Sequence, residues 1–227
     1  MYRKKLLHVI KYLYGLRDIY CHADGYRAYK TLPKEVTIVG CFAHARRKFH
    51  EAVSILTEEQ KKDSKAVIGL NYCNKLFALD AAIEDEDPEF RYKYRQEKAK
   101  PLLAEFLVWL KSCNATPKSH LGRAITYCIN QWPYLENYLL DGRLDLSNNR
   151  AEHLAKQFAV CRKNFLFSNT PKGATASAVT LSIIATAMAN DLDPFEYLTY
   201  VFKTAPNICL TNANEVAKLL PWNVSLK

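Results

Sequence analysis

Two short β-prone runs near the start of the chain constrain the fold most. Residues 18–24 and 36–41 are rich in branched and aromatic side chains, and a helical pattern follows each of them. The order helix, strand, helix, strand, helix over residues 6–56 is typical of a layer with parallel strands. We therefore predict an α/β core of parallel strands with flanking helices.

The pattern changes over residues 57–140, where we expect long charged helices and no strand. Polar or acidic stretches at residues 84–89 and 113–119 predict turns between these helices, and a third helix is expected to end before Pro133. The remaining helices of the core resume after residues 141–142. An all-helical insertion therefore interrupts the predicted core, and the chain is expected to be predominantly helical.

Composition points to a polyanionic partner in a reducing compartment. Lys and Arg outnumber Asp and Glu by 32 to 23, which gives a net charge of +9 and favours a partner such as nucleic acid. The seven cysteines are scattered, odd in number and without a CxxC pair, which argues against a disulfide framework. We expect a cytoplasmic protein.

One uncharged stretch, residues 174–190, raises the question of a membrane span. Thr and Ser side chains dilute its apolar character, and it is shorter than the ~20 apolar residues that cross a bilayer. A buried helix is therefore expected, and no membrane partner.

Two acidic residues stand out as candidate metal ligands. Asp24 ends the first β-prone run and precedes Gly25, at the edge where open α/β sheets place ligands. Glu152 lies in the first turn of a helix that Ser147 or Asn148 can cap, and faces away from the apolar stripe of that helix. Their hard oxygens suit two Mg²⁺ ions, about 4 Å apart, that catalyse phosphoryl transfer on DNA.

Each acid also has a simpler interpretation. Asp before Gly is common turn chemistry. Glu152 and Lys156 are spaced to form an ordinary surface ion pair on a helix.

Basic residues near both acids are candidate phosphate contacts, although a solvated helical face would have the same composition. They are Arg46, Arg47 and Lys48 after the second run, and Lys156, Arg162 and Lys163 near Glu152. Cys41 and His44, with Cys21 and His22, suggest a zinc site as a weaker alternative, because two pairs of adjacent residues suit tetrahedral geometry poorly.

Seven longer motifs, in order from about residue 10 to about residue 205, resemble those of one known family, the insertion-sequence-66 family of bacterial transposases. They are HADGYRAY, VGCFAHARRKF, CNKLFAL, LGRAITYCINQWPYL, DGRLDLSNNRAEHLAKQF, RKNFLFSNTPKGATASA and DPFEYLTYVF.

The resemblance implies a ribonuclease H-like catalytic domain with a DDE triad, a helical insertion before the Glu, and Mg²⁺ or Mn²⁺ as cofactor. The family's second Asp falls on Asp24 and its Glu on Glu152, where His153 replaces the Arg that often follows. Its first Asp lies on a strand upstream of the part that this chain resembles. The family's DNA-binding and zinc-binding regions also lie upstream of that part. The expected divisions are a ribonuclease H-like segment, the insertion, the helices with the Glu, and a C-terminal helix and tail, at residues 1–56, 57–140, 141–190 and 191–227.

The resulting expectation is the C-terminal portion of a DDE transposase, which partners DNA and other transposase subunits. Such a chain is expected to be inactive alone, because the first Asp is missing. The main alternative is a non-catalytic DNA-binding or regulatory remnant.

Overall fold

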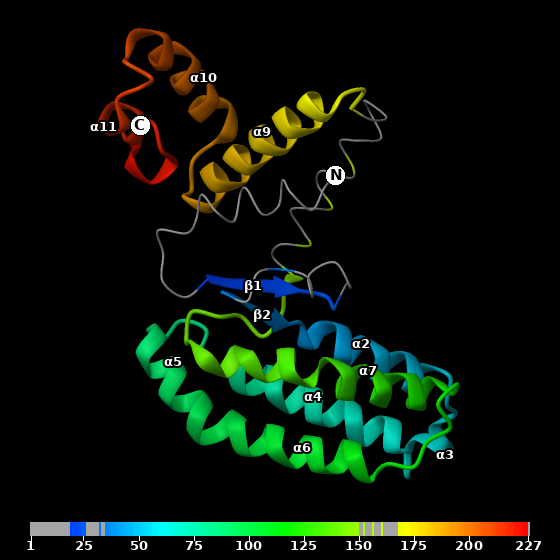
Figure 1. The fold of residues 1–227 in the computed structure, drawn as a ribbon. Coiled ribbons are helices and arrows are strands. Elements are labelled where there is room, and N and C mark those ends of the chain that lie inside the picture. Colours follow the sequence, from blue (N-terminus) through cyan, green and yellow to red (C-terminus); the bar gives the residue numbers. More distant parts are fainter. Residues whose placement is uncertain are drawn as a thin grey trace. The chain divides into compact units, whose positions relative to one another are not determined.

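A computed structural model describes residues 19–25, 32, 35–149, 152, 156, 160 and 168–226. The chain divides into two compact units, residues 1–150 and 151–227, which are described separately (Figure 1). The helices expected before the first strand and between the two strands fall, apart from Leu32, outside the described residues.

The first unit contains a small parallel sheet. Strand β1 (Ile19–Ala23) pairs with strand β2 (Val36–Gly40) in a register that runs from Ile19 opposite Val36 to Ala23 opposite Gly40. Both strands and their parallel direction are confirmed. The chain is predominantly helical with this two-stranded sheet, whereas the ribonuclease H-like topology stays a prediction.

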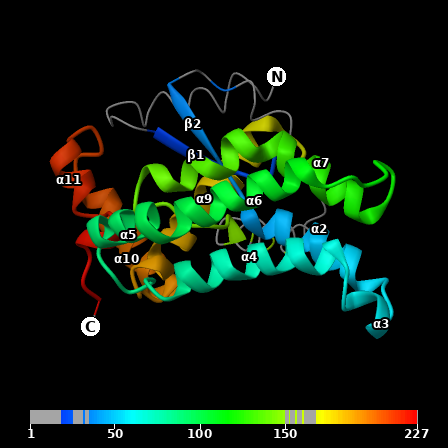
Figure 2. The ribbon, with the colours of Figure 1, turned by 90° about the horizontal axis from the view of Figure 1, so that it is seen from below.

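Helices that come before and within the predicted insertion form one bundle. Helix α2 (Phe42–Ser54) packs against α4 (Lys65–Ala81) and α7 (His120–Leu135), and α6 (Lys100–Ser112) packs against the same two helices. The helices lie alongside one another beneath the sheet, so that the contacts close a ring (Figures 1 and 2). Helix α2 is therefore as much a member of the bundle as the helices after it.

Aromatic and aliphatic side chains from all of these helices fill the bundle. Phe49 and Phe106 are fully buried, with ring centroids 6.0 Å apart, and Tyr72 stacks on Phe106 at 4.9 Å. The rest of the buried set includes Phe42, Ala45, Cys73, Leu76, Leu103, Leu110, Ala124, Cys128, Trp132 and Leu135. Burial of this size is the main favourable contribution to the stability of the unit.

Capping side chains mark where the helices of residues 57–140 begin. Thr57 forms a capping box with Gln60 at α3 (Glu58–Lys61), and Asp87 caps α5 (Pro88–Tyr94). Ser64 and Ser119 cap α4 and α7. A π-helical turn, η2 (Arg95–Ala99), joins α5 to α6, and a 3₁₀ turn, η3 (Glu136–Leu140), follows α7. All of residues 57–140 are described and none is in a strand, which confirms an all-helical stretch.

The prediction that a helix ends before Pro133 is wrong. Helix α7 continues through Pro133 to Leu135. Proline removes the hydrogen bond to the carbonyl of the residue four positions earlier, here Ile129. Both residues are exposed, so water can solvate this carbonyl, while the buried Trp132 and Leu135 hold the last turn against the core.

The second unit is also helical in its described part. It contains α9 (Pro171–Ala189), α10 (Pro194–Thr204) and α11 (Ala213–Ala217), with 3₁₀ turns η4 (Ala205–Asn207) and η5 (Pro221–Asn223). Asp193 accepts the backbone N–H groups of Phe195 and Glu196 and so caps the start of α10. The hydroxyl of Tyr197 donates to the carbonyl of Leu219 at 2.6 Å and ties α10 to the end of the chain.

Helix α9 forms where the uncharged stretch predicts it, but it is not the buried helix expected. Only Ala187 is fully buried along it. Hydroxyls of Thr175, Thr180 and Thr186 donate to carbonyls four residues earlier, so polar groups lie on several sides of the helix. Among the described residues it is the one helix long and apolar enough to cross a bilayer, which is weak evidence for a membrane span.

Candidate functional site

Asp24 lies at the carboxyl edge of the parallel sheet. It follows Ala23, whose partner in β2 is Gly40, and Cys41 occupies the equivalent place after β2, immediately before α2. Asp24 is exposed. The predicted position of this acid, at the end of a parallel strand, is therefore the observed one.

The turn after Asp24 needs glycine for two reasons. Gly25 has φ +85°, in the left-handed region that side chains rarely adopt. A Cβ at this position would also lie 2.9 Å from Oε1 of Gln131, on α7. The turn interpretation of Asp24 and Gly25 is thus correct in itself, and it leaves the Asp24 side chain exposed.

Side chains from several elements hold the sheet edge. His22 donates through Nε2 to the carbonyl of Gly40 at 3.1 Å, and burial is the main cause of its lowered pKa. The amide of Asn137 donates to the carbonyl of Ile38 at 2.8 Å. The hydroxyl of Tyr127 donates to the backbone carbonyl of Asp24 at 3.3 Å. The end of the bundle thus fixes both strands.

The three neighbouring cations of α2 do not share one direction. Arg46 donates to Oδ1 of Asn74 at 2.7 Å and lies over the ring of Phe77, both on α4. Lys48 is half-buried, and its ammonium lies 5.2 Å from the ring centroid of Tyr127 on α7. Arg47 is exposed between them.

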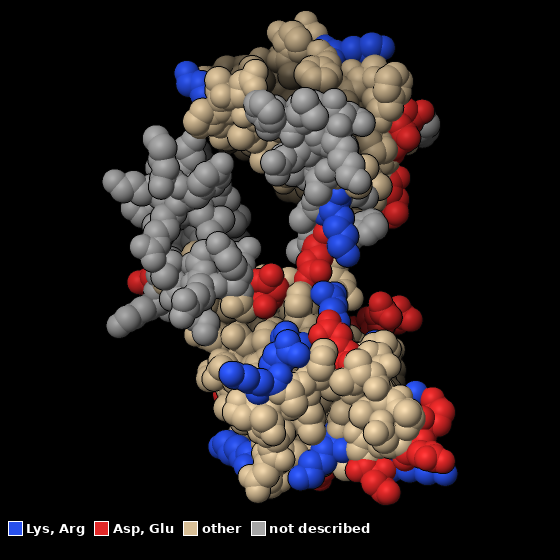
Figure 3. All heavy atoms as spheres, turned by 90° about the vertical axis from the view of Figure 1, so that its right-hand side faces the viewer, with Lys and Arg blue, Asp and Glu red and all other residues tan. Residues whose placement is uncertain are grey.

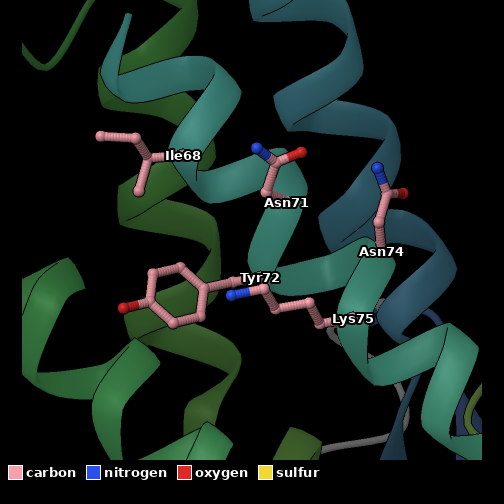
Figure 4. Close-up of a pocket in the computed structure, with 5 residues that line it drawn as sticks. All are labelled: Ile68, Asn71, Tyr72, Asn74 and Lys75. Carbon is pink, nitrogen blue, oxygen red and sulfur yellow. The ribbon is translucent and has the colours of Figure 1, made fainter. Parts of the chain in front are cut away.

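Arg47 and Lys48 are therefore the cations associated with Tyr127, whose hydroxyl reaches Asp24. Burial raises the pKa of Tyr127, Asp24 adds to that rise, and Arg47 opposes it. On the face shown in Figure 3, basic and acidic side chains are interspersed over the bundle, without a single basic patch.

Three residues of the alternative zinc site, Cys41, Cys21 and His44, lie in the first unit. Cys41 is buried, and its sulfur accepts the backbone N–H of Asn148 at 3.4 Å. Burial raises the pKa of the Cys21 thiol, which disfavours the thiolate that zinc binds. His44 lies in the first turn of α2.

The connection that leads toward Glu152 is anchored to the bundle. The backbone N–H of Phe42 donates to the carbonyl of Leu146 at 3.0 Å, and Leu146 is buried. The guanidinium of Arg95 donates to the carbonyl of Asp141 at 3.2 Å. A helix then begins at Asn149.

Glu152 and Lys156 are helical residues of the second unit, half-buried and exposed respectively. Arg162 and Lys163 lie outside the described residues. The structure thus brings Asp24 close to the Arg47 and Lys48 region, and the place of Glu152 relative to Asp24 stays a prediction.

Sequence reasoning did not find Tyr127 and Gln131. Tyr127 is 103 residues from its partner Asp24, and its position within an ordinary helical pattern carries no sign of the contact. The only available signal was Gly25, since a glycine after an acid can mark a close approach as well as a turn.

Two family models together match most of the chain. The model of the transposase IS66 family matches residues 3–176, and that of the IS66 C-terminal element matches residues 182–222. No solved structure matches the chain.

Similar curated proteins include two uncharacterized proteins of Sinorhizobium fredii. The protein y4hP is 33% identical over 204 residues, 86% of this chain and 36% of its own length. The protein y4qI is 30% identical over 227 residues, 95% of this chain and 40% of its own length. This chain thus spans about 40% of the length of these relatives. By the family match, which covers most of its length, the chain belongs to the IS66 family of transposases.

Proposed function

We propose that this chain supplies two metal-binding carboxylates, Asp24 and Glu152, to a DDE transposase with a ribonuclease H-like domain. The observation that carries the proposal is the exposed Asp24 at the carboxyl edge of a parallel strand, within the stretch that the family model matches. Carboxylate oxygens are the hard ligands that Mg²⁺ and Mn²⁺ prefer, so the two side chains fit the metal that the family implies.

The contribution of the chain is to hold metal and DNA in place. Asp24 and Glu152 would each donate a carboxylate oxygen, and Arg47 and Lys48 would neutralise phosphates beside Asp24. The bound metal would activate the attacking oxygen and stabilise the leaving one.

A third carboxylate is expected on a further strand, in a longer protein than residues 1–227. Two carboxylates hold a metal pair less well than three, so we expect no strand transfer by this chain alone. The activity, the DNA partner and association with other transposase subunits are proposals for the whole protein, since the relatives are longer.

Metal binding provides the direct test. Asp24→Asn and Glu152→Gln should each weaken Mn²⁺ binding at least about tenfold, because loss of a group just outside a metal site already costs 10–100-fold. The measurement is the free Mn²⁺ remaining in solution, by electron paramagnetic resonance. Asp85→Asn and Glu105→Gln are matched controls, since both residues are exposed acids on the bundle. Equal Mn²⁺ binding by all five proteins would refute the assignment.

A non-catalytic DNA-binding role is the second candidate, and the exposed Arg47 favours it. Arg47→Ala should weaken DNA binding and lower the slope of log affinity against log salt by about 1, the share of one phosphate contact. Arg46→Ala should change this slope less, because its guanidinium already binds Asn74.

Fluorescence anisotropy with a duplex at several salt concentrations measures both quantities. Lys93→Gln is the control, since its ammonium is exposed but already paired with Glu89 at 2.7 Å. A slope that is unchanged by Arg47→Ala would exclude Arg47 as a phosphate contact. DNA binding without Asp24-dependent Mn²⁺ binding would favour this second candidate over the first.

A further inference from the structure

We infer that α7 is a positioning element for Asp24 and acts through Tyr127 and Gln131. The inference rests on the proposed function, because it assigns these residues to the geometry of the proposed metal ligand. They do not touch the metal or the DNA in this proposal. They determine where the Asp24 carboxylate points.

The side-chain amide of Gln131 packs against the turn at Gly25. Its side chain is 8% exposed, and its Oε1 and Cδ lie 2.9 and 3.0 Å from the place that a Cβ at residue 25 would take. The backbone of Gly25 therefore lies directly against the amide group. The φ of +85° at Gly25 is a second reason why this position needs glycine, since side chains rarely adopt that region.

Tyr127 holds the other side of the turn. Its hydroxyl donates to the carbonyl of Asp24 at 3.3 Å, one turn of α7 before Gln131. The same ring carries the ammonium of Lys48 at 5.2 Å from its centroid. Tyr127 therefore contacts both the backbone of Asp24 and Lys48, which is proposed to bind a phosphate.

The helix that presents these residues is itself firmly anchored. The face of α7 next to these two residues is buried in the bundle at Ala124, Cys128, Trp132 and Leu135. Ser119 caps its first turn by accepting the N–H of Gly122 at 3.0 Å. The packing of α7 in the bundle therefore supports the acid at the sheet edge.

Nuclear magnetic resonance of the whole chain tests the support, with the order parameter of the Gly25 amide as readout. The wild-type value should be near the 0.85 of rigid backbone, and the double variant Tyr127→Phe with Gln131→Ala should bring it below about 0.6. Each single variant should give an intermediate value. Mn²⁺ binding should weaken about threefold to tenfold in the double variant, the effect of one lost hydrogen bond or slightly more.

Tyr92→Phe and Asn130→Ala are matched controls, since Tyr92 lies on α5 and the exposed Asn130 lies on α7 beside Gln131. A Gly25 amide that stays rigid in the double variant would overturn the inference, and so would a mobile Gly25 with unchanged Mn²⁺ affinity. If the wild-type chain shows no Asp24-dependent Mn²⁺ binding, the proposed metal function fails, and the Gly25 order parameter alone decides whether α7 holds the turn.

Discussion

Arg95→Ala should lower the free energy of unfolding of the first unit by about 3–5 kcal/mol, because it leaves a partly buried carboxylate without its cation. Arg95 is 1% exposed, and its Nε and Nη2 donate to Oδ1 of Asp80 at 2.9 and 2.6 Å. Its Nη1 donates to the carbonyls of Tyr138 and Asp141 at 3.4 and 3.2 Å. One side chain therefore joins α4, η2, η3 and the connection toward Glu152.

Urea unfolding followed by circular dichroism measures the loss. Asp80→Ala should cost a similar amount. Arg95→Met combined with Asp80→Leu should cost less than either alanine change, because the double variant leaves no unpaired charge in the core. Lys93→Ala, which removes an exposed ion pair with Glu89, should cost far less than Arg95→Ala. A loss below about 1 kcal/mol for Arg95→Ala would contradict the structural role assigned to this residue.

Gly142→Ala should destabilise the same unit by about 1–3 kcal/mol or more through overpacking. A Cβ here would lie 1.8 Å from the carbonyl oxygen of Pro88 and 3.0 Å from the backbone N of Tyr92. These are backbone atoms, so neither can rotate away, and α5 or the connection itself must move. The displaced connection is the one that Leu146 anchors to the start of α2.

Unfolding by urea again measures this effect, and Gly173→Ala is the matched control. A Cβ at Gly173 would meet only side-chain atoms, the nearest being Oγ1 of Thr170 at 3.3 Å. Because alanine favours the helical conformation, this change should alter stability by less than about 0.5 kcal/mol or raise it slightly. Equal effects of the two glycine changes would exclude close approach as the reason for Gly142.

Local patterns predicted both strands and the helical stretch of residues 57–140, and the structure confirms them. The pattern of each of these features lies in residues that are close together in the sequence. The two errors concern surroundings that a local pattern does not contain. Pro133 stays helical because its side of α7 is exposed, and α9 is little buried although its composition is apolar.

At the candidate site, too, the sequence predicted only what nearby residues determine. The position of Asp24 follows from the direction of one strand, so the sequence sufficed for it. Its attachment to Tyr127 joins residues 103 positions apart, and the different directions of Arg46 and Lys48 depend on which helices lie beside α2. Such facts arise from packing between distant segments, and no short-range pattern encodes them.

The closed ring of helices has a consequence for the order in which the chain can fold during synthesis. Helix α2 is made early, but one of its two packing partners, α7, ends only at Leu135. Because domains fold as their chain emerges from the ribosome, Phe42 and Phe49 must wait for about eighty more residues before their burial is complete. The Asp24 turn waits longer, since its partner Tyr127 lies 103 residues further along the chain. A nascent chain that stalls before α7 would therefore expose its core and leave this turn without its support.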